Sequence, residues 1–134
     1  MIAKVKSTLT YGSFDLLHFG HIELLRRAKS LGLPVFVGLS TNKFNIEKGK
    51  DCFQSYDYRK KILEELKCVD LVFPEEDWNQ KINDISKYEA TNFVMGSDWT
   101  GKFDHLSKYV NVHYFQRTAE ISSSLIKTSI RNNV

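Results

Sequence analysis

The fold can be read outward from one stretch of sequence, Tyr11-Gly12-Ser13-Phe14-Asp15-Leu16-Leu17-His18-Phe19-Gly20-His21. Before it, residues 7–11 alternate Thr, Leu and aromatic side chains and stop at Gly12, which is typical of a strand. After it, apolar residues recur at helical spacing until Gly32 and Pro34: Leu24, Leu25, Ala28 and Leu31. The stretch is therefore predicted to be the turn between a first strand and a helix that begins near Gly20.

The next segments repeat this alternation of strand and helix. Residues 35–39 form a short, nearly continuous apolar run, as expected of a strand covered on both faces. Residues 40–54 are predicted to be a polar loop. Ser55 is a candidate N-cap for a second helix, and one face of that helix would carry Ile62, Leu63, Leu66 and Val69.

The second half of the chain continues the pattern. Residues 71–73 are predicted to be a third strand that ends before Pro74, and residues 93–95 a fourth. Between them, residues 81–88 are weakly helical. Val110, Val112 and Tyr114 alternate as a fifth strand. Ser122 is expected to cap a closing helix that contains Leu125, Ile126 and Ile130.

Repeated strand–helix units predict an α/β fold. We expect one Rossmann-like domain over residues 1–134, with a parallel five-stranded sheet flanked by helices and right-handed crossovers. The length of 134 residues fits a single domain. In such sheets ligands bind beyond the carboxyl ends of the strands, where the strand order reverses. The turn after the first strand is the first place to look for a site.

Composition excludes several classes of protein. The 42% hydrophobic and 26% charged residues are typical of a globular chain. A net charge of +3 is too small and too evenly spread to indicate a nucleic-acid partner. No leader pattern and no apolar run of about 18 residues occurs, so we expect a cytoplasmic protein with no membrane span. Cys52 and Cys68 lack metal-ligand spacing and are interpreted as ordinary thiols, with Cys68 in the core.

Two histidines, His18 and His21, lie three positions apart at the mouth of the first helix. A helix N-terminus offers N–H groups and partial positive charge that attract phosphate, and imidazole adds further donors. Spacing alone favours the plainer interpretation, in which two histidines lie three apart by chance and either one is merely hydrogen-bonded in the core. The preceding strand, Gly12 and Gly20 favour a phosphate site. A metal site is disfavoured because no third ligand lies nearby.

These residues resemble the HxGH signature of the cytidylyltransferase family. Residues 117–124, Arg-Thr-Ala-Glu-Ile-Ser-Ser-Ser, are similar to its second signature, RTxGIS[ST]T. The resemblance is strongest to the bacterial members that use glycerol 3-phosphate. It implies a homodimer that converts CTP and glycerol 3-phosphate to CDP-glycerol and pyrophosphate by direct in-line attack on the α-phosphate. Mg²⁺ would be bound through the triphosphate, and the product would serve teichoic-acid or capsule synthesis.

The resemblance also implies roles for individual residues. The implied catalytic residues are His18, His21, Lys48, Lys50 and Arg117. The implied nucleotide-binding residues are Ser13, Phe14, His18, Phe19, Gly20, His21, Asp98, Trp99, Arg117, Thr118, Ile121, Ser122, Ser123 and Ser124. The implied acceptor-binding residues are Lys48, Lys50 and Lys81.

Without the resemblance, several of these residues have ordinary interpretations. Lys48 and Lys50 would belong to a solvated loop, and Arg59 and Lys81 would be solvated helix charges. Residues 96–103 reproduce the glycines and lysine of a P-loop, but Phe103 stands where Mg²⁺ binding needs Ser or Thr. We therefore reject a P-loop.

The sequence also departs from the family pattern. Lys67 stands where arginine is usual, and Ala119-Glu120 stands where the second residue is usually glycine, while Ser13, Ser123 and Ser124 replace threonines but keep the hydroxyl. Two alternatives stay open. One is cytidylyl or adenylyl transfer to another alcohol phosphate, such as ethanolamine or choline phosphate. The other is a nucleotide-binding protein with weak or no turnover.

Overall fold

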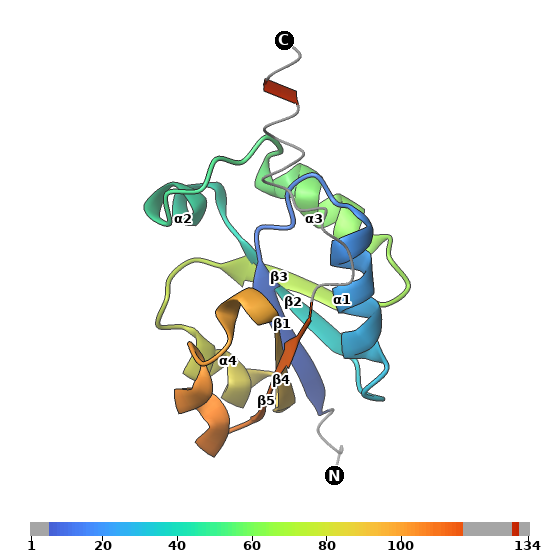
Figure 1. Cartoon of the computed structure of the whole chain (residues 1–134), viewed down its shortest axis with the longest axis vertical. Coiled ribbons are helices and arrows are strands. Elements are labelled where there is room, and N and C mark those ends of the chain that lie inside the picture. Colours follow the sequence, from blue (N-terminus) through green and yellow to red (C-terminus); the bar gives the residue numbers. More distant parts are fainter. Residues whose placement is uncertain (1–5, 117–129, 132–134) are drawn as a thin grey trace.

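The computed structural model describes residues 6–116 and 130–131. Within residues 6–116 the chain forms a five-stranded, wholly parallel sheet (Figure 1). Its strands are β1 (Ser7–Gly12), β2 (Val35–Ser40), β3 (Leu71–Glu75), β4 (Ala90–Gly96) and β5 (Asn111–Phe115). The spatial order is β3-β2-β1-β4-β5. From β1 the chain adds β2 and then β3 on one side of the sheet, and it then crosses to the other side of β1 to add β4 and β5. The strand order therefore reverses between β1 and β4.

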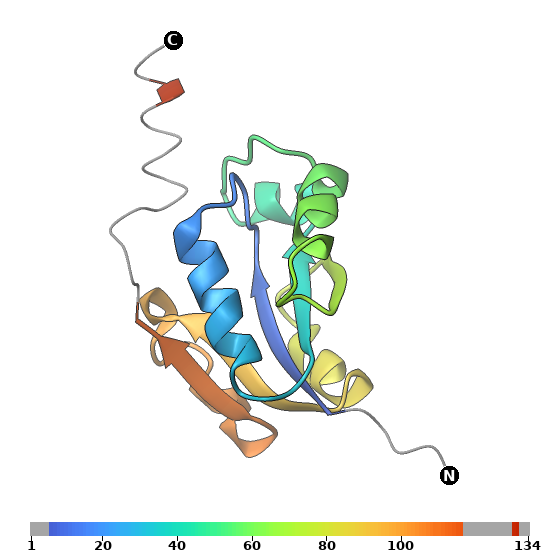
Figure 2. The same ribbon diagram turned by 90° about the vertical axis from the view of Figure 1, so that its right-hand side faces the viewer.

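Helices cover both faces of this sheet (Figures 1 and 2). Helices α1 (Phe19–Lys29) and α3 (Tyr56–Glu64) pack on one face. Helix α4 (Lys81–Lys87) and the 3₁₀ helix η2 (Asp104–Lys108) pack on the other. The short helix α2 (Asn42–Glu47) follows β2, and the 3₁₀ turn η1 (Ser97–Trp99) follows β4. The predicted α/β sheet with flanking helices is confirmed.

Strand residues alternate between two apolar cores, as the period of two requires. The core under α1 and α3 contains Phe14, Leu25, Ala28, Val35, Val37, Leu39, Leu63, Val69, Val72 and Val94. The core under α4 and η2 contains Leu9, Tyr11, Phe73, Ile85, Phe93, Met95, Phe103, Leu106 and Val110. Cys68 is only partly buried and packs at the margin of the first core.

Gly38 shows why one position in the middle of the sheet has no side chain. It pairs with Tyr11 across β1 and β2. A Cβ atom there would lie 2.3 Å from the Cδ2 atom of the Tyr11 ring. The backbone of β2 therefore approaches this aromatic ring more closely than any other residue type would allow.

The segment 40–54 is not the uniform loop that its polarity suggested, because α2 lies within it. The Thr41 hydroxyl caps this helix by accepting a hydrogen bond from the Phe44 N–H at 3.1 Å. Phe44 is fully buried and anchors the helix. One apolar anchor in six residues is too weak a periodicity to predict a helix, so the prediction was wrong here.

Three element ends also differ from expectation. Strand β3 continues through Pro74 to Glu75, which is possible because β3 is an edge strand of the described sheet and Pro lacks only a donor. Helix α1 ends at Lys29, so Leu31 lies beyond it and is 36% exposed. Helix α3 ends at Glu64, and Val69 packs from the following turn. The closing helix expected from Ser122 lies outside the described residues except for Ile130 and Arg131, which are helical.

Candidate active site

A cavity of about 470 Å³ opens at the carboxyl ends of β1 and β4, where the strand order reverses. Its walls come from the turn after β1, from α1, from the loop after α2 and from the residues after β4. Five of the predicted nucleotide-binding residues line it: Ser13, Phe14, His21, Asp98 and Trp99. Lys50 lines it as well. This is the position in which an open parallel sheet binds its ligand.

His18 and His21 are held against each other at the start of α1. Their ring centroids lie 3.9 Å apart in a stacked arrangement. His18 is the N-cap residue, and its Nδ1 accepts the Gly20 N–H at 3.0 Å. In return, the His18 N–H donates to Nδ1 of His21 at 3.2 Å, which completes a capping box. Each neutral ring therefore carries its proton on Nε2, where it can donate to a phosphate oxygen.

The pKa of His21 is lowered to about 3. Burial is the main cause, and the neighbouring His18 lowers it further. His21 is thus neutral at physiological pH. His21 therefore supplies an oriented N–H donor rather than a positive charge, and such preorganised donors stabilise charge that develops on a reacting oxygen.

The turn between β1 and α1 has an unusual backbone that is fixed by side chains. Phe14 and Leu16 adopt φ angles of 47° and 51°, in the left-handed region. The buried Asp15 carboxylate between them accepts the N–H groups of Phe53 and Gln54 at 2.7 and 3.0 Å. The Gln54 side chain accepts the Leu16 N–H at 3.1 Å. The two loops that enclose the cavity therefore hold each other in place.

Arg59 is not the solvated helix charge that the sequence suggested, because only 1% of its surface is exposed. Its Nε donates to the Gln54 carbonyl at 2.9 Å. Its Nη1 donates to the carbonyls of Ser13 at 2.9 Å and Ser40 at 2.7 Å, and Nη2 donates to Asn42 at 3.0 Å. The guanidinium thus joins the turn after β1 to the end of β2 and to the loop before α3. It positions the walls of the cavity.

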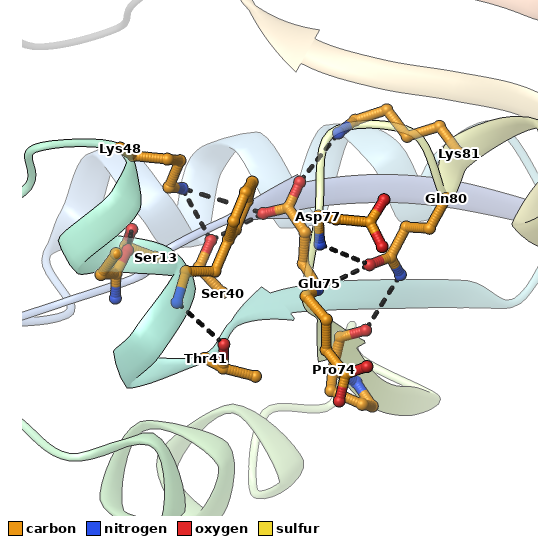
Figure 3. Close-up of polar contacts among 12 residues, drawn as sticks. Ser13, Ser40, Thr41, Lys48, Pro74, Glu75, Asp77, Gln80 and Lys81 are labelled. Carbon is orange, nitrogen blue, oxygen red and sulfur yellow. Dashed lines mark hydrogen bonds and ion pairs between the residues drawn. The ribbon is translucent and has the colours of Figure 1, made fainter.

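Lys81 is also buried, with 4% of its surface exposed, although its helix position suggested solvent. It belongs to a charge cluster with Lys48, Ser40 and Glu75 (Figure 3). Lys81 Nζ lies 2.8 Å from Glu75 Oε2, and Lys48 Nζ lies 3.8 Å from Glu75 Oε1. The Ser40 hydroxyl donates to Oε1 at 2.6 Å and accepts from Lys48 at 2.7 Å. One carboxylate therefore orients two of the three predicted acceptor-binding lysines, Lys48 and Lys81.

Glu75 was missed by the sequence analysis. The signal was present, because an acidic residue directly follows the apolar strand residues 71–73. Carboxyl ends of parallel strands collect functional groups. The early strand end assigned at Pro74 placed Glu75 in a loop and hid this position.

Burial lowers the pKa of Lys48 to about 8, partly opposed by Glu75, while Lys50, Lys81 and Arg59 lower it further. Lys48, Lys81 and Glu75 line a small cavity of about 40 Å³ that shares Tyr11, Gly12, Lys50, Met95 and Trp99 with the larger one. The cationic groups therefore lie beside the histidine cavity, where a second anionic ligand would meet the first.

Some predicted residues do not line the cavity, among them His18, whose ring stacks on that of His21. Phe19 is 58% exposed, and the Gly20 N–H is used in the helix cap. Lys67 is exposed. Six further predicted site residues lie outside the described part of the chain: Arg117, Thr118, Ile121, Ser122, Ser123 and Ser124. Residues 96–103 form η1 and a turn rather than a strand–loop–helix unit, and Phe103 is buried, so the rejection of a P-loop stands.

No three His, Cys, Asp or Glu side chains gather into a metal-binding group within residues 6–116 and 130–131. Carboxylates that line the larger cavity are Asp15, Asp51 and Asp98. Asp51 forms an ion pair with Arg131, and Asp15 accepts two backbone N–H groups. Asp98 is exposed at the rim and lines the same cavity as His21. This donor set fits an ion that phosphate oxygens hold and a single carboxylate assists. In the same described part of the chain, no helix is long and apolar enough to cross a membrane.

The parallel sheet, the switch-point cavity and the histidine pair at a helix mouth define a nucleotide-binding α/β protein. Residues 9–129 match the cytidylyltransferase-like family model. The chain belongs to the cytidylyltransferase-like family.

Individual relatives agree with this assignment. The chain is 51% identical to the glycerol-3-phosphate cytidylyltransferase of Bacillus spizizenii, over 92% of this chain and 95% of that protein. It is 48% identical to the enzyme of the same name from Staphylococcus aureus, over 94% and 96%. Among solved structures, a lipopolysaccharide core biosynthesis protein from Thermoplasma volcanium superposes with a TM-score of 0.75 at 21% identity, over 86% of this chain and 99% of that one. This last similarity supports the fold alone.

Proposed function

We propose that this protein is a glycerol-3-phosphate cytidylyltransferase, which converts CTP and glycerol 3-phosphate to CDP-glycerol and pyrophosphate. The observation that carries the proposal is the stacked His18–His21 pair at the start of α1, with both Nδ1 atoms bonded to backbone N–H groups. Sequence identity of 48–51% to proteins of that name, over more than nine-tenths of both lengths, supports the choice of nucleotide and acceptor.

In the proposed reaction a phosphate oxygen of glycerol 3-phosphate attacks the α-phosphorus of CTP in line with the departing pyrophosphate. A new P–O bond forms as the bond to the β-phosphate oxygen breaks, without a covalent enzyme intermediate. His18 and His21 donate from Nε2 to the phosphate oxygens on which charge accumulates. Ser13, Phe14, Asp98 and Trp99 line the same cavity and would hold the nucleotide.

The lysines form the second half of the proposal. Lys48 and Lys81 share the Glu75 carboxylate, and Lys50 lines both cavities. Two positive charges around one carboxylate leave net positive charge, which suits the dianionic phosphate of the acceptor. The family resemblance implies that the remaining phosphate contacts would come from Arg117, Thr118, Ile121, Ser122, Ser123 and Ser124.

Mg²⁺ belongs to the proposal as an ion held by triphosphate oxygens, with Asp98 as the carboxylate that would assist it. When bound, it would neutralise charge on the leaving pyrophosphate. This chain's own residues orient the two substrates. A homodimer in the cytoplasm stays a prediction, and light scattering after size-exclusion chromatography would test the dimer.

The test is pyrophosphate release from CTP with glycerol 3-phosphate. We expect His18→Ala and His21→Ala each to lower kcat by about 10²–10³, the usual loss for one preorganised donor. His113→Asn is the matched control, because His113 lies in β5 and contacts Asn92 instead of the cavity. Near-normal turnover in both histidine variants, or an equal loss in the control, would refute the assigned role.

A further inference from the structure

We propose that Lys81 fills an aromatic cage with the chain's own cation, and that this occupancy makes the enzyme reject acceptors carrying a positive charge. Phosphates of uncharged polyols would be accepted, whereas choline and ethanolamine phosphates would be excluded. The inference rests on the proposed function and deepens it by assigning acceptor selectivity to one residue.

Three aromatic rings surround the Lys81 ammonium group. Its Nζ lies 4.6 Å from the ring centroid of Tyr11, 5.6 Å from that of Trp78 and 5.5 Å from that of Phe103. The rings come from β1, from the loop after β3 and from the segment before η2. All three distances fall within the ~6 Å at which a cation is attracted to an aromatic face.

A carboxylate completes this cage. Glu75 Oε2 lies 2.8 Å from Lys81 Nζ, and Glu75 is 3% exposed (Figure 3). Aromatic walls together with one buried carboxylate are the chemistry that recognises alkylammonium ligands. In this chain the alkylammonium group is covalently attached, because it is a lysine side chain.

Lys81 also stands between two cavities. On one side lies the 40 Å³ cavity that adjoins the histidine site, and on the other lies a cavity of about 350 Å³. Lys81 lines both cavities, and so do three aromatic residues, Trp78, Trp99 and Phe103. Removing the lysine side chain would therefore join them and give an acceptor's ammonium group a place beside the reaction site.

Charge supports the same selectivity. A second cation at this position would meet Lys81 and Lys48, which already share Glu75. Like charges close together in a buried site repel each other strongly, whereas the hydroxyls of glycerol carry no charge. The lysine thus provides attraction for the acceptor phosphate and repulsion against a cationic head group, which is how specificity is commonly built.

The first experiment measures binding without turnover. Tetramethylammonium chloride is titrated into the protein while Trp78 and Trp99 fluorescence is followed, with sodium chloride as the ionic-strength control. We expect saturable quenching in Lys81→Ala, in which the cage is vacated, and none in the wild type. Lys81→Met removes the charge but still fills the cage, so this variant should also show no saturable quenching. Lys87→Ala, which removes an exposed lysine beside Tyr88 on the same helix, is the matched control.

The second experiment compares kcat/KM for glycerol 3-phosphate and choline phosphate. We expect Lys81→Ala to shift the ratio toward choline phosphate by at least about tenfold, the scale on which one pocket group discriminates. Circular dichroism shows whether each variant is folded. If Lys81→Ala does not fold, Lys81→Ser is measured in its place. Saturable tetramethylammonium binding by the wild type overturns the inference, as does a folded Lys81→Ala variant with neither quenching nor a changed ratio. Absence of CDP-glycerol formation by the wild type contradicts the proposed function instead.

Discussion

Replacing Arg59 with lysine should destabilise the protein strongly even though the charge is kept. The guanidinium makes four hydrogen bonds of 2.7–3.0 Å while almost wholly buried. A lysine ammonium is a single point that cannot span acceptors on three segments. Two or more charge-assisted hydrogen bonds, each contributing about 1.5–3 kcal/mol, would be lost. We expect the free energy of unfolding to fall by about 3–5 kcal/mol.

Urea denaturation followed by tryptophan fluorescence measures this loss. With a slope of about 2 kcal/mol per molar urea, a loss of this size lowers the midpoint by about 2 M. Arg26→Lys is the matched control, because Arg26 also makes two short hydrogen bonds, to Glu23, but on the exposed face of α1. Its midpoint should not move. Equal midpoints for the two variants would refute the reasoning, and weakened CTP binding without loss of stability would show that Arg59 contacts phosphate instead.

Three further predictions follow from the packing and the pKa shifts. The folded pKa of His21 is about 3, below the unfolded value of about 6.5, so the unfolded chain binds a proton first. The free energy of unfolding should fall by up to about 1.4 kcal/mol per pH unit between pH 6.5 and 3. Urea denaturation repeated across this pH range should show a smaller dependence of that free energy on pH in His21→Gln. Because the Lys48 pKa is about 8, kcat/KM should decline above that pH, and Lys48→Arg should move the decline upward; an unchanged basic limb would contradict this. Gly38→Ala should cost about 1–3 kcal/mol by overpacking against Tyr11, whereas Gly96→Ala, whose Cβ meets no atom within 4 Å, should unfold at nearly the wild-type midpoint.

The sheet could be predicted from sequence because each strand carries its own evidence. Residues 35–39 of β2 and 93–95 of β4 are covered on both faces, so these stretches are nearly continuously apolar and depend on no distant partner. Helix α2 was missed for the opposite reason, since it depends on the Thr41 cap and on a single buried ring, Phe44.

The histidine pair could be located from sequence because strand, turn and helix mouth lie within eleven consecutive residues. The buried charges could not. Arg59 bonds to the Ser13 and Ser40 carbonyls, 46 and 19 positions away, and nothing local distinguishes it from a solvated arginine. A charge is stable inside a protein only when distant partners are assembled around it. Sequence pattern reports periodicity, whereas these partners are set by the topology.

The capping box at the start of α1 gives His18 two roles that favour different residue types. His18 both begins the helix and carries a donor assigned to the reaction, yet histidine is not among the residues that cap helices best. Asparagine, aspartate or serine there would favour the helix start while removing the imidazole. Selection for a more stable fold and selection for catalysis therefore oppose each other at His18, and directed evolution for thermal resistance alone would be expected to yield inactive protein through this site.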